Sequence, residues 1–353
     1  MCACGELKLK AIRVLVVDDS ELIRQVLTEV ISQAPDLEVV GAAEDPLVAR
    51  EMIKQLNPDV LTLDVEMPKM DGISFLRNLM RLRPMPVVMI STLTEKGAPV
   101  TLDALEIGAV DYIAKPQGGS WQNLKAYAAV IQQKVRDAAS ANMMAHDRAT
   151  KPEVMQPGAI RQCFKPGRVI CIGSSTGGTE AIKVVLKGMP QNCPPIVIAQ
   201  HIPPVFSATL ATRLNNLCGI TVREAKSGMP LESGNAYLAP GDFHLKLRNK
   251  GGQLVTLITE GERVNGHMPS VEVLFKSVLE HAGNKTVAAL LTGMGSDGAQ
   301  GLKEICESGG CTIAQDQDSS VVWGMPGSAV KLNAAQQVLS IEKIGKGLLK
   351  ACL

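Results

Sequence analysis

The sequence has almost no excess of charge of either sign, because 36 lysines and arginines stand against 35 aspartates and glutamates. Proteins that hold nucleic acid or anionic membranes by electrostatic attraction carry a basic patch or stripe. The sequence also lacks an apolar run of about 20 residues, the length of a membrane-spanning helix, and it lacks a signal peptide. We therefore expect a soluble, cytoplasmic protein without membrane insertion and without a nucleic-acid partner.

Cysteine is present but has no organised spacing. The nine cysteines show neither the paired spacing of a zinc site nor the framework of a disulfide-rich domain. Cys2 and Cys4 stand at the N-terminus, and Cys171 and Cys193 lie in or beside apolar segments. This pattern suits a reducing compartment, where most of these thiols serve as small apolar side chains.

Apolar residues make up 46% of the 353 residues, and charged residues make up 20%. This composition is typical of globular proteins, and the length suggests about two domains. Residues 140–166 lose hydrophobic periodicity and contain several prolines, as linkers do. We predict a leader at 1–10, a first domain at 11–138, a linker at 139–166 and a second domain at 167–353.

The first domain is predicted to be a doubly wound α/β domain with a parallel sheet. Short β-branched apolar segments alternate with segments of helical periodicity, and this alternation places helices on both faces of a parallel sheet. Asp45-Pro46 is expected to begin a helix that ends before Asn57-Pro58. The predicted strands are 11–17, 37–42, 59–64, 86–91 and 111–116.

Polar side chains stand at the ends of the predicted strands, where ligands bind in such sheets. These residues are Asp18, Asp19, Asp64, Ser91 and Lys115. Three converging carboxylates repel one another unless a cation neutralises them, and Mg²⁺ prefers oxygen ligands of this kind. The lysine and the hydroxyl opposite would complete a cradle for a phosphoryl group.

Residues 11–137 resemble the response-regulator receiver domain of two-component signalling, which has a flavodoxin-like fold. The resemblance rests on the motifs Val17-Asp-Asp-Ser20, Leu63-Asp-Val-Glu-Met-Pro-Lys-Met-Asp-Gly72, Ile90-Ser91 and Ala114-Lys-Pro116. It implies that a histidine kinase is the phosphodonor and that the domain is a switch acting on the second domain.

The receiver resemblance also assigns roles to the polar residues. It implies that Asp64 is the phospho-acceptor and that Asp18 and Asp19 hold Mg²⁺ together with it. It implies further that Ser91 senses the phosphoryl group and that Lys115 pairs with it.

The second domain is predicted to be another doubly wound parallel sheet, Rossmann-like, with β-hairpins added beside it. Residues 235–259 alternate in polarity and turn at Pro240-Gly241 and Gly251-Gly252, which predicts the hairpins. The tail from Ser328 is predicted to be a helix and a closing strand. The predicted strands of the main sheet are 168–172, 195–200, 220–225, 285–292 and 311–314, and the predicted helices are 180–187, 205–215, 270–282 and one from 299.

The turn Gly173-Ser-Ser-Thr-Gly177 joins the first of these strands to its helix. It fits the G-x-S-x-G pattern that exposes a nucleophilic serine, here Ser175. The amides at the start of the helix could hold a developing oxyanion. A glycine- and serine-rich turn can instead cradle a phosphate, although the segment matches neither the dinucleotide motif nor the Walker A motif.

A nucleophilic serine needs a base within hydrogen-bond reach and a carboxylate that orients this base. His201 and Asp297 follow two other predicted strands at their carboxyl ends, as Ser175 follows the first. All three would meet at one edge of one sheet. Asp316 and Asp318 also follow a strand and are the rival carboxylates.

The remaining histidines receive other interpretations. His267 lies in a glycine- and proline-marked loop that could line the site. His244 lies in a predicted hairpin and is expected at the surface. His281 stands late in a helix, where the dipole favours a cation, and His146 lies in the predicted linker.

Three segments of the second domain resemble the catalytic motifs of the chemotaxis protein-glutamate methylesterase (CheB) family. They are Ile172-Gly-Ser-Ser-Thr-Gly-Gly-Thr-Glu180, Ala199-Gln-His-Ile-Pro203 and Leu291-Thr-Gly-Met-Gly-Ser-Asp-Gly298. The order of receiver, linker and effector also matches, so the resemblance covers nearly the whole chain. One departure is Ser174, where many members of the family have alanine.

The resemblance implies that Ser175 is the nucleophile, His201 the general base and Asp297 its orienting carboxylate. It implies that the backbone N–H of Met294 contributes to the oxyanion hole and that Thr176 lines the site. No cofactor is expected in this domain.

By this resemblance the protein is a phosphorylation-activated hydrolase of glutamate γ-methyl esters on methyl-accepting chemotaxis receptors. It is also expected to deamidate receptor glutamines through the same acyl-enzyme. The unphosphorylated receiver is expected to cover the active-site edge until Asp64 is phosphorylated. The alternatives are a receiver-controlled DNA-binding or nucleotide-binding protein without esterase activity, and an esterase with a different substrate.

Overall fold

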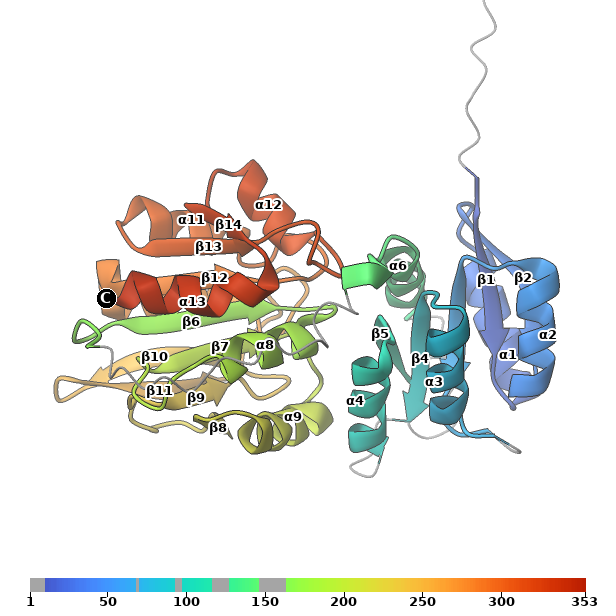
Figure 1. Ribbon diagram of the computed structural model, residues 1–353, viewed down its shortest axis with the longest axis horizontal. Coiled ribbons are helices and arrows are strands. Elements are labelled where there is room, and N and C mark those ends of the chain that lie inside the picture. The colour runs from blue at the N-terminus through green and yellow to red at the C-terminus, as the bar shows by residue number, and fades with distance from the viewer. Residues whose placement is uncertain (1–9, 68–69, 93–96, 116–126, 146–162) are drawn as a thin grey trace, which may run out of the picture. The chain divides into compact units, whose positions relative to one another are not determined.

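The computed structural model describes residues 10–67, 70–92, 97–115, 127–145 and 163–353. Contacts divide the chain into an N-terminal unit, Met1–Ala141, and a C-terminal unit, Asn142–Leu353 (Figure 1). The predictions for residues 1–9, for His146 and for most of the linker fall outside the described residues.

The N-terminal unit is a five-stranded parallel sheet in the order β2-β1-β3-β4-β5. Its strands are β1 (Ile12–Val17), β2 (Leu37–Ala43), β3 (Val60–Asp64), β4 (Val87–Thr92) and β5 (Asp111–Lys115). Its helices are α1 (Glu21–Ser32), α2 (Pro46–Leu56), α3 (Gly72–Leu82), α4 (Gly97–Ile107) and α6 (Ala128–Ala139). The prediction of a doubly wound sheet is confirmed. The strand order reverses between β1 and β3, which opens a crevice at their carboxyl ends.

The boundaries of α2 show how local sequence sets an element. The carboxylate of Asp45 accepts hydrogen bonds from the amides of Leu47 and Val48, and Pro46 occupies the first turn. At the other end Asn57 adopts a left-handed conformation with φ of 47°. Both ends of this helix agree with the prediction.

The C-terminal unit is built on a seven-stranded parallel sheet in the order β14-β13-β12-β6-β7-β9-β8. These strands are β6 (Val169–Ser174), β7 (Ile196–Gln200), β8 (Thr221–Glu224), β9 (Asn235–Leu238), β12 (Thr286–Leu290), β13 (Cys311–Gln315) and β14 (Gln337–Leu339). Its helices are α8 (Gly178–Lys187), α9 (Pro204–Leu217), α10 (Val271–Ala282), α11 (Ala299–Glu307), α12 (Met325–Lys331) and α13 (Ile341–Cys352), with a 3₁₀ turn at Gly283–Lys285. Strand β6 has β7 on one side and β12 on the other, so the strand order reverses here too.

The prediction of hairpins over residues 235–259 is wrong for its first part. Asn235–Leu238 is not a hairpin arm but strand β9, which lies between β7 and β8 in the main sheet. Only β10 (His244–Lys250) and β11 (Gln253–Thr259) pair as an antiparallel hairpin. The chain also ends in α13, a helix after the predicted closing strand.

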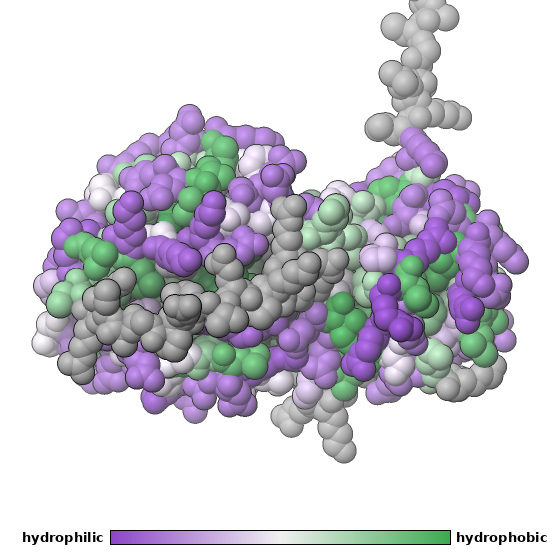
Figure 2. Space-filling view, viewed as in Figure 1, coloured by the Kyte–Doolittle hydropathy of each residue, from purple (hydrophilic) through white to green (hydrophobic). Residues whose placement is uncertain are grey.

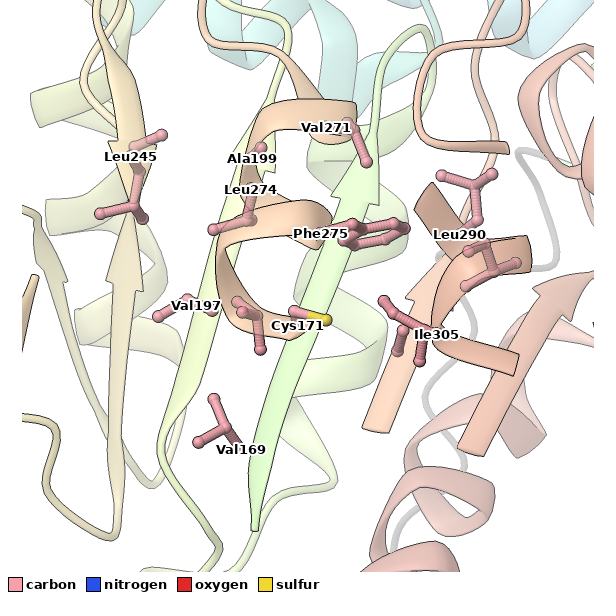
Figure 3. Packing of buried hydrophobic residues seen from close by; sticks show 14 of the residues in the cluster. Val169, Cys171, Val197, Ala199, Leu245, Val271, Leu274, Phe275, Leu290 and Ile305 are labelled. Carbon is pink, nitrogen blue, oxygen red and sulfur yellow. The ribbon is translucent and has the colours of Figure 1, made fainter. Parts of the chain in front are cut away.

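The core on one face of the seven-stranded sheet lies beneath α10, α11 and α12. Alternate residues of the strands point to this face, among them Cys171, Val197 and Leu290. Leu274 and Phe275 of α10 lie over them (Figure 3). Two neighbouring helices, α8 and α13, pack against each other and against the sheet (Figure 1). This packing holds the carboxyl ends of β6, β7 and β12 in fixed positions.

The view in Figure 2 shows a surface on which hydrophilic residues predominate and apolar residues are scattered. Over the part of the chain that the structure describes, no helix is both long and apolar enough to span a bilayer.

Candidate active site

The acidic residues of the N-terminal unit meet at the crevice between β1 and β3. Carboxylate oxygens of Asp18, Asp19 and Asp64 lie within 4.8 Å of one another. The ammonium group of Lys115, at the end of β5, lies 3.0 Å from Asp18 Oδ2 and 2.8 Å from Asp64 Oδ2. Asp18 and Asp64 are buried, whereas Asp19 is exposed.

The electrostatics of this cluster favour a bound cation. Burial raises the pKa of Asp64 to about 6, and the charge of Lys115 offsets only part of that effect. Burial likewise raises the pKa of Asp18 against the same lysine. Burial alone would lower the pKa of Lys115, but attraction to Asp64 and Asp18 raises it. The single positive charge of Lys115 does not balance the negative charges of the three carboxylates. A divalent cation with oxygen ligands would balance the remaining negative charge.

Ser91, the penultimate residue of β4, is buried and directly follows Ile90, the residue that pairs with Asp64 of β3. Its hydroxyl lies 2.9 Å from the hydroxyl of Thr101 in α4. Thr101 in turn donates to the carbonyl of Gly97 at the start of that helix. The switch serine predicted from the sequence is therefore in contact with α4.

In the C-terminal unit, three adjacent strands bring their carboxyl ends together. Ser175 directly follows β6, and its N–H donates to the carbonyl of Thr292 after β12 at 3.0 Å. His201 directly follows β7, and its N–H donates to the carbonyl of Ser174 at 3.2 Å. The nucleophile and the base predicted from the sequence thus begin from neighbouring points of the backbone. This is the position at which the strand order reverses.

Asp297 and His201 are joined by a hydrogen bond between Asp297 Oδ2 and His201 Nε2 at 2.9 Å. The side chain of Asp297 is 1% exposed and that of His201 is 8% exposed. Of the rival carboxylates, that of Asp316 accepts from Ser319 in a local turn. Within the described residues neither Asp316 nor Asp318 is hydrogen-bonded to His201, whose carboxylate partner is Asp297.

Asp297 accepts hydrogen bonds from several other donors at the N-terminus of α10. Its Oδ2 accepts from the amide of Val271 at 2.7 Å, and its Oδ1 accepts from Asn265 Nδ2 and Ser270 Oγ, both at 2.9 Å. Burial raises the pKa of this carboxyl, but the hydrogen bond and charge of His201, with the bonds from Asn265 and Val271, lower it to about 2. Asp297 is therefore ionised at neutral pH and held in one orientation.

The other ring nitrogen of His201, Nδ1, has no partner among the residues that the structure describes. Nδ1 is buried and makes no hydrogen bond within the described part of the chain, so no bond to Ser175 is formed in this structure. A buried polar atom left unpaired costs roughly 1–3 kcal/mol, and such atoms occur where a reaction needs them. Catalytic hydrogen bonds are often long or absent before substrate binds.

His267 lies against His201, with ring centroids 3.6 Å apart and planes within 9° of parallel. The structure thus places this further candidate from the sequence at the site. His244, predicted at the surface, is instead buried. Its Nδ1 accepts from the amide of Ser270 and its Nε2 donates to the carbonyl of Glu262. The prediction failed because a residue that begins a hairpin can face the main body as readily as solvent.

The loop after β12 lies close to Ser175. A Cβ on Gly293 would be 2.7 Å from the Cβ of Ser175. Within the described residues the N–H of Met294 has no hydrogen-bond acceptor, whereas the neighbouring N–H of Gly293 donates to Val322. Thr176 is buried, and its carbonyl accepts from the hydroxyl of Thr292.

Sequence reasoning missed three residues of this site: Asn265, Ser270 and Gln200. Ser270 had a usable signal, since a serine before an apolar helical segment is a common N-cap, and here it accepts from the amide of Val273. No local sequence signal identifies Asn265, because its hydrogen-bond partner Asp297 is 32 residues away in the sequence. Gln200 lay within a quoted motif but was given no role.

The two folds and their strand-end residues define a class: a response regulator whose output unit is a hydrolase. Residues 170–348 match the CheB methylesterase family and residues 14–126 match the response regulator receiver domain. The chain therefore belongs to the CheB methylesterase family and is an enzyme of the protein-glutamate methylesterase/protein-glutamine glutaminase class.

The similarity to known proteins extends over nearly the whole chain. It is 54% identical over 347 residues to "Protein-glutamate methylesterase/protein-glutamine glutaminase 2" of Saccharophagus degradans, with 98% of this chain and 100% of the relative covered. It is 50% identical over 338 residues to "Protein-glutamate methylesterase/protein-glutamine glutaminase" of Salmonella typhimurium, with 96% of each covered. Among solved structures, the CheB methylesterase catalytic domain of Thermotoga maritima matches with 38% identity and a TM-score of 0.51, covering 53% of this chain and 99% of that one.

Proposed function

We propose that the enzyme hydrolyses glutamate γ-methyl esters of methyl-accepting chemotaxis receptors, and deamidates receptor glutamines, with Ser175, His201 and Asp297 as its catalytic triad. The observation that carries the proposal is the buried pair of His201 and Asp297 beside Ser175. The Asp297 carboxylate is ionised and hydrogen-bonded through both oxygens. His201 Nδ1 has no partner among the described residues, and the backbone of His201 is hydrogen-bonded to Ser174, which directly precedes Ser175. The names of the relatives supply the substrate class.

In this mechanism His201 Nδ1 takes the proton of the Ser175 hydroxyl as Oγ attacks the carbonyl carbon of the ester. The tetrahedral intermediate collapses when His201 returns the proton to the departing methoxide, which leaves as methanol. The acyl-enzyme is then attacked by a water molecule that His201 deprotonates. The second tetrahedral intermediate expels Ser175 Oγ, which takes the proton back from His201, and the product is a free carboxylic acid that ionises to the carboxylate. An amide substrate follows the same course and releases ammonia. Asp297 stays ionised throughout and stabilises the imidazolium.

The oxyanion of the tetrahedral intermediate needs a donor that is already in place. The N–H of Met294 is suited to this role because it has no acceptor among the described residues, and Gly293 lets its loop approach Ser175 closely. Thr176 would line the same site from the other strand.

In the N-terminal unit we propose that Asp64 accepts a phosphoryl group from a chemotaxis histidine kinase. Asp18, Asp19 and Asp64 would hold Mg²⁺, which, when bound, neutralises the charge of the transferred group. Lys115, already in contact with Asp64, would pair with a phosphoryl oxygen. Ser91 would leave its contact with Thr101 to bind another oxygen. This exchange would couple phosphorylation to α4 and so to the activity of the second unit.

The test is methanol release from methylated receptor membranes. Ser175→Ala should lower the rate by about 10⁴-fold or more, as removal of a triad serine does in other hydrolases. Ser308→Ala, which changes an exposed serine at the end of α11, is the matched control and should keep the wild-type rate. A Ser175→Ala enzyme that released methanol at a similar rate would refute the triad.

The same assay addresses the substrate. An enzyme that cleaves a small methyl ester in a Ser175-dependent manner but leaves methylated receptors intact would retain the triad and lose the receptor assignment. The DNA-binding and nucleotide-binding alternatives have no observation in their favour.

A further inference from the structure

The side chain of Gln200, the last residue of β7, lies between the nucleophile and the base. It is 3% exposed. Its Nε2 donates to the carbonyl of Ser175 at 2.9 Å and to the carbonyl of His201 at 3.2 Å. One amide group therefore holds the backbone at both residues whose side chains must meet.

The orientation of this amide is set by Ser174. The hydroxyl of Ser174 donates to Gln200 Oε1 at 2.6 Å, and Ser174 itself is fully buried. The two carbonyls can only accept, so Nε2 must face them and Oε1 must face the hydroxyl. Without this hydroxyl the Oε1 atom would be buried without its donor.

The start of α8 leaves room for this arrangement. A Cβ on Gly178 would be 2.2 Å from Gln200 Oε1 and 2.7 Å from the Cβ of Ser174. The N–H of Gly178 also donates to the carbonyl of Ser175 at 2.7 Å. The carbonyl of the nucleophile thus has two donors, one from its own turn and one from the neighbouring strand.

We infer that Gln200 is a positioning residue that fixes the backbones of Ser175 and His201 relative to each other, and that Ser174 fixes Gln200. The inference rests on the proposed function of Ser175 and His201. A displacement of reacting groups by about 1 Å can cost about 100-fold in rate. Since Gln200 is 3% exposed and its amide is held by Ser174, Ser175 and His201, its loss should lower kcat and leave KM nearly unchanged.

The experiment compares Gln200→Met, Ser174→Ala and the double variant in methanol release from methylated receptor membranes, using the full chain. Gln200→Met keeps the length of the side chain and removes both donors. We expect kcat to fall about 100-fold for Gln200→Met, by analogy with a misplaced reacting group. The fall should be smaller for Ser174→Ala, because Gln200 Nε2 keeps its two carbonyl acceptors. The double variant should be no slower than Gln200→Met alone, because both residues act through one contact.

The matched control is Gln336→Met. Gln336 also bridges two backbone groups, the N–H of Thr312 and the carbonyl of Gly310. These groups lie at the amino end of β13, whereas the candidate active site lies at the carboxyl ends of the strands. Gln336→Met should keep wild-type kcat. If Gln200→Met does not fold, as judged from its thermal transition, Ser174→Ala alone still tests the inference.

A folded Gln200→Met with kcat within 2-fold of wild type would overturn the positioning role. An unchanged kcat in Ser174→Ala would overturn the part assigned to Ser174. Failure of the proposed function itself looks different, because the wild-type protein would then show no methanol release that depends on Ser175.

Discussion

Asp297 is the residue at which burial and hydrogen bonding oppose each other most directly. A buried carboxylate is expensive unless donors surround it, and here donors come from a histidine, an asparagine, a serine and the first amides of α10. The sequence predicted Asp297 and His201 as partners because both follow apolar strands. It could not predict the remaining donors, since they come from a loop whose path depends on the packed helix.

The pKa of Asp297 yields a prediction about stability. The pKa falls from 3.8 in the unfolded chain to about 2 in the folded one, so the carboxylate stabilises the fold above pH 4 and this contribution is lost as the pH falls toward 2. The shift corresponds to about 2 kcal/mol. Asp297→Asn should therefore unfold more easily than wild type at pH 7, in urea titrations, and the difference should shrink between pH 4 and pH 2.

The acidic cluster of the N-terminal unit titrates equally in both proteins, so it cancels from that comparison. A difference in unfolding free energy that stayed constant from pH 7 to pH 2 would show that Asp297 does not contribute through its charge.

At the scale of the element, the loop after β12 is constrained by its approach to β6. We expect Gly293→Ala to lower kcat about 100-fold, because the new methyl group would lie 2.7 Å from the Cβ of Ser175 and 2.5 Å from Met325 Sδ, and displacement of a nucleophile costs about this much. Gly219→Ala, with no atom within 4 Å of the new methyl group, is the control. Steady-state methanol release measures both, and equal rates would contradict the prediction.

The elements themselves were largely predictable from hydrophobic periodicity. Asp45 and Asn57 bound α2 as expected, and the helix predicted at 270–282 is present as Val271–Ala282, with its apolar residues in the core. The error at β9 has a physical cause. Alternating polarity and a Pro-Gly turn identify an extended segment, but they do not say whether it pairs with its neighbour in sequence or with a distant parallel strand.

At the scale of the whole molecule, the N-terminal unit should control the rate of the C-terminal one. We expect a small phosphodonor with Mg²⁺ to raise the methylesterase rate of the full chain, and Asp64→Asn to abolish this increase while keeping the resting rate. The fragment 163–353 should be faster than the unphosphorylated full chain. The solved catalytic domain of the Thermotoga maritima relative, which covers 53% of this chain, indicates that such a fragment folds.

A phosphodonor that raised the rate of Asp64→Asn as much as that of wild type would place the phosphoryl group elsewhere. A fragment and a full chain of equal rate would leave the sequence-based expectation of a covering receiver without support.

Both sheets reverse their strand order where the proposed reactive residue lies. The reversal falls between β1 and β3, which ends in Asp64, in one unit and at β6, which Ser175 follows, in the other. At such a reversal the loops that follow two neighbouring strands run to opposite faces of the sheet, and a crevice forms between them above an intact core. Substitutions in these loops can therefore change the reaction at each crevice while the sheet and its packed helices stay the same. The same kind of strand reversal thus positions the proposed input site and the proposed output site of one chain.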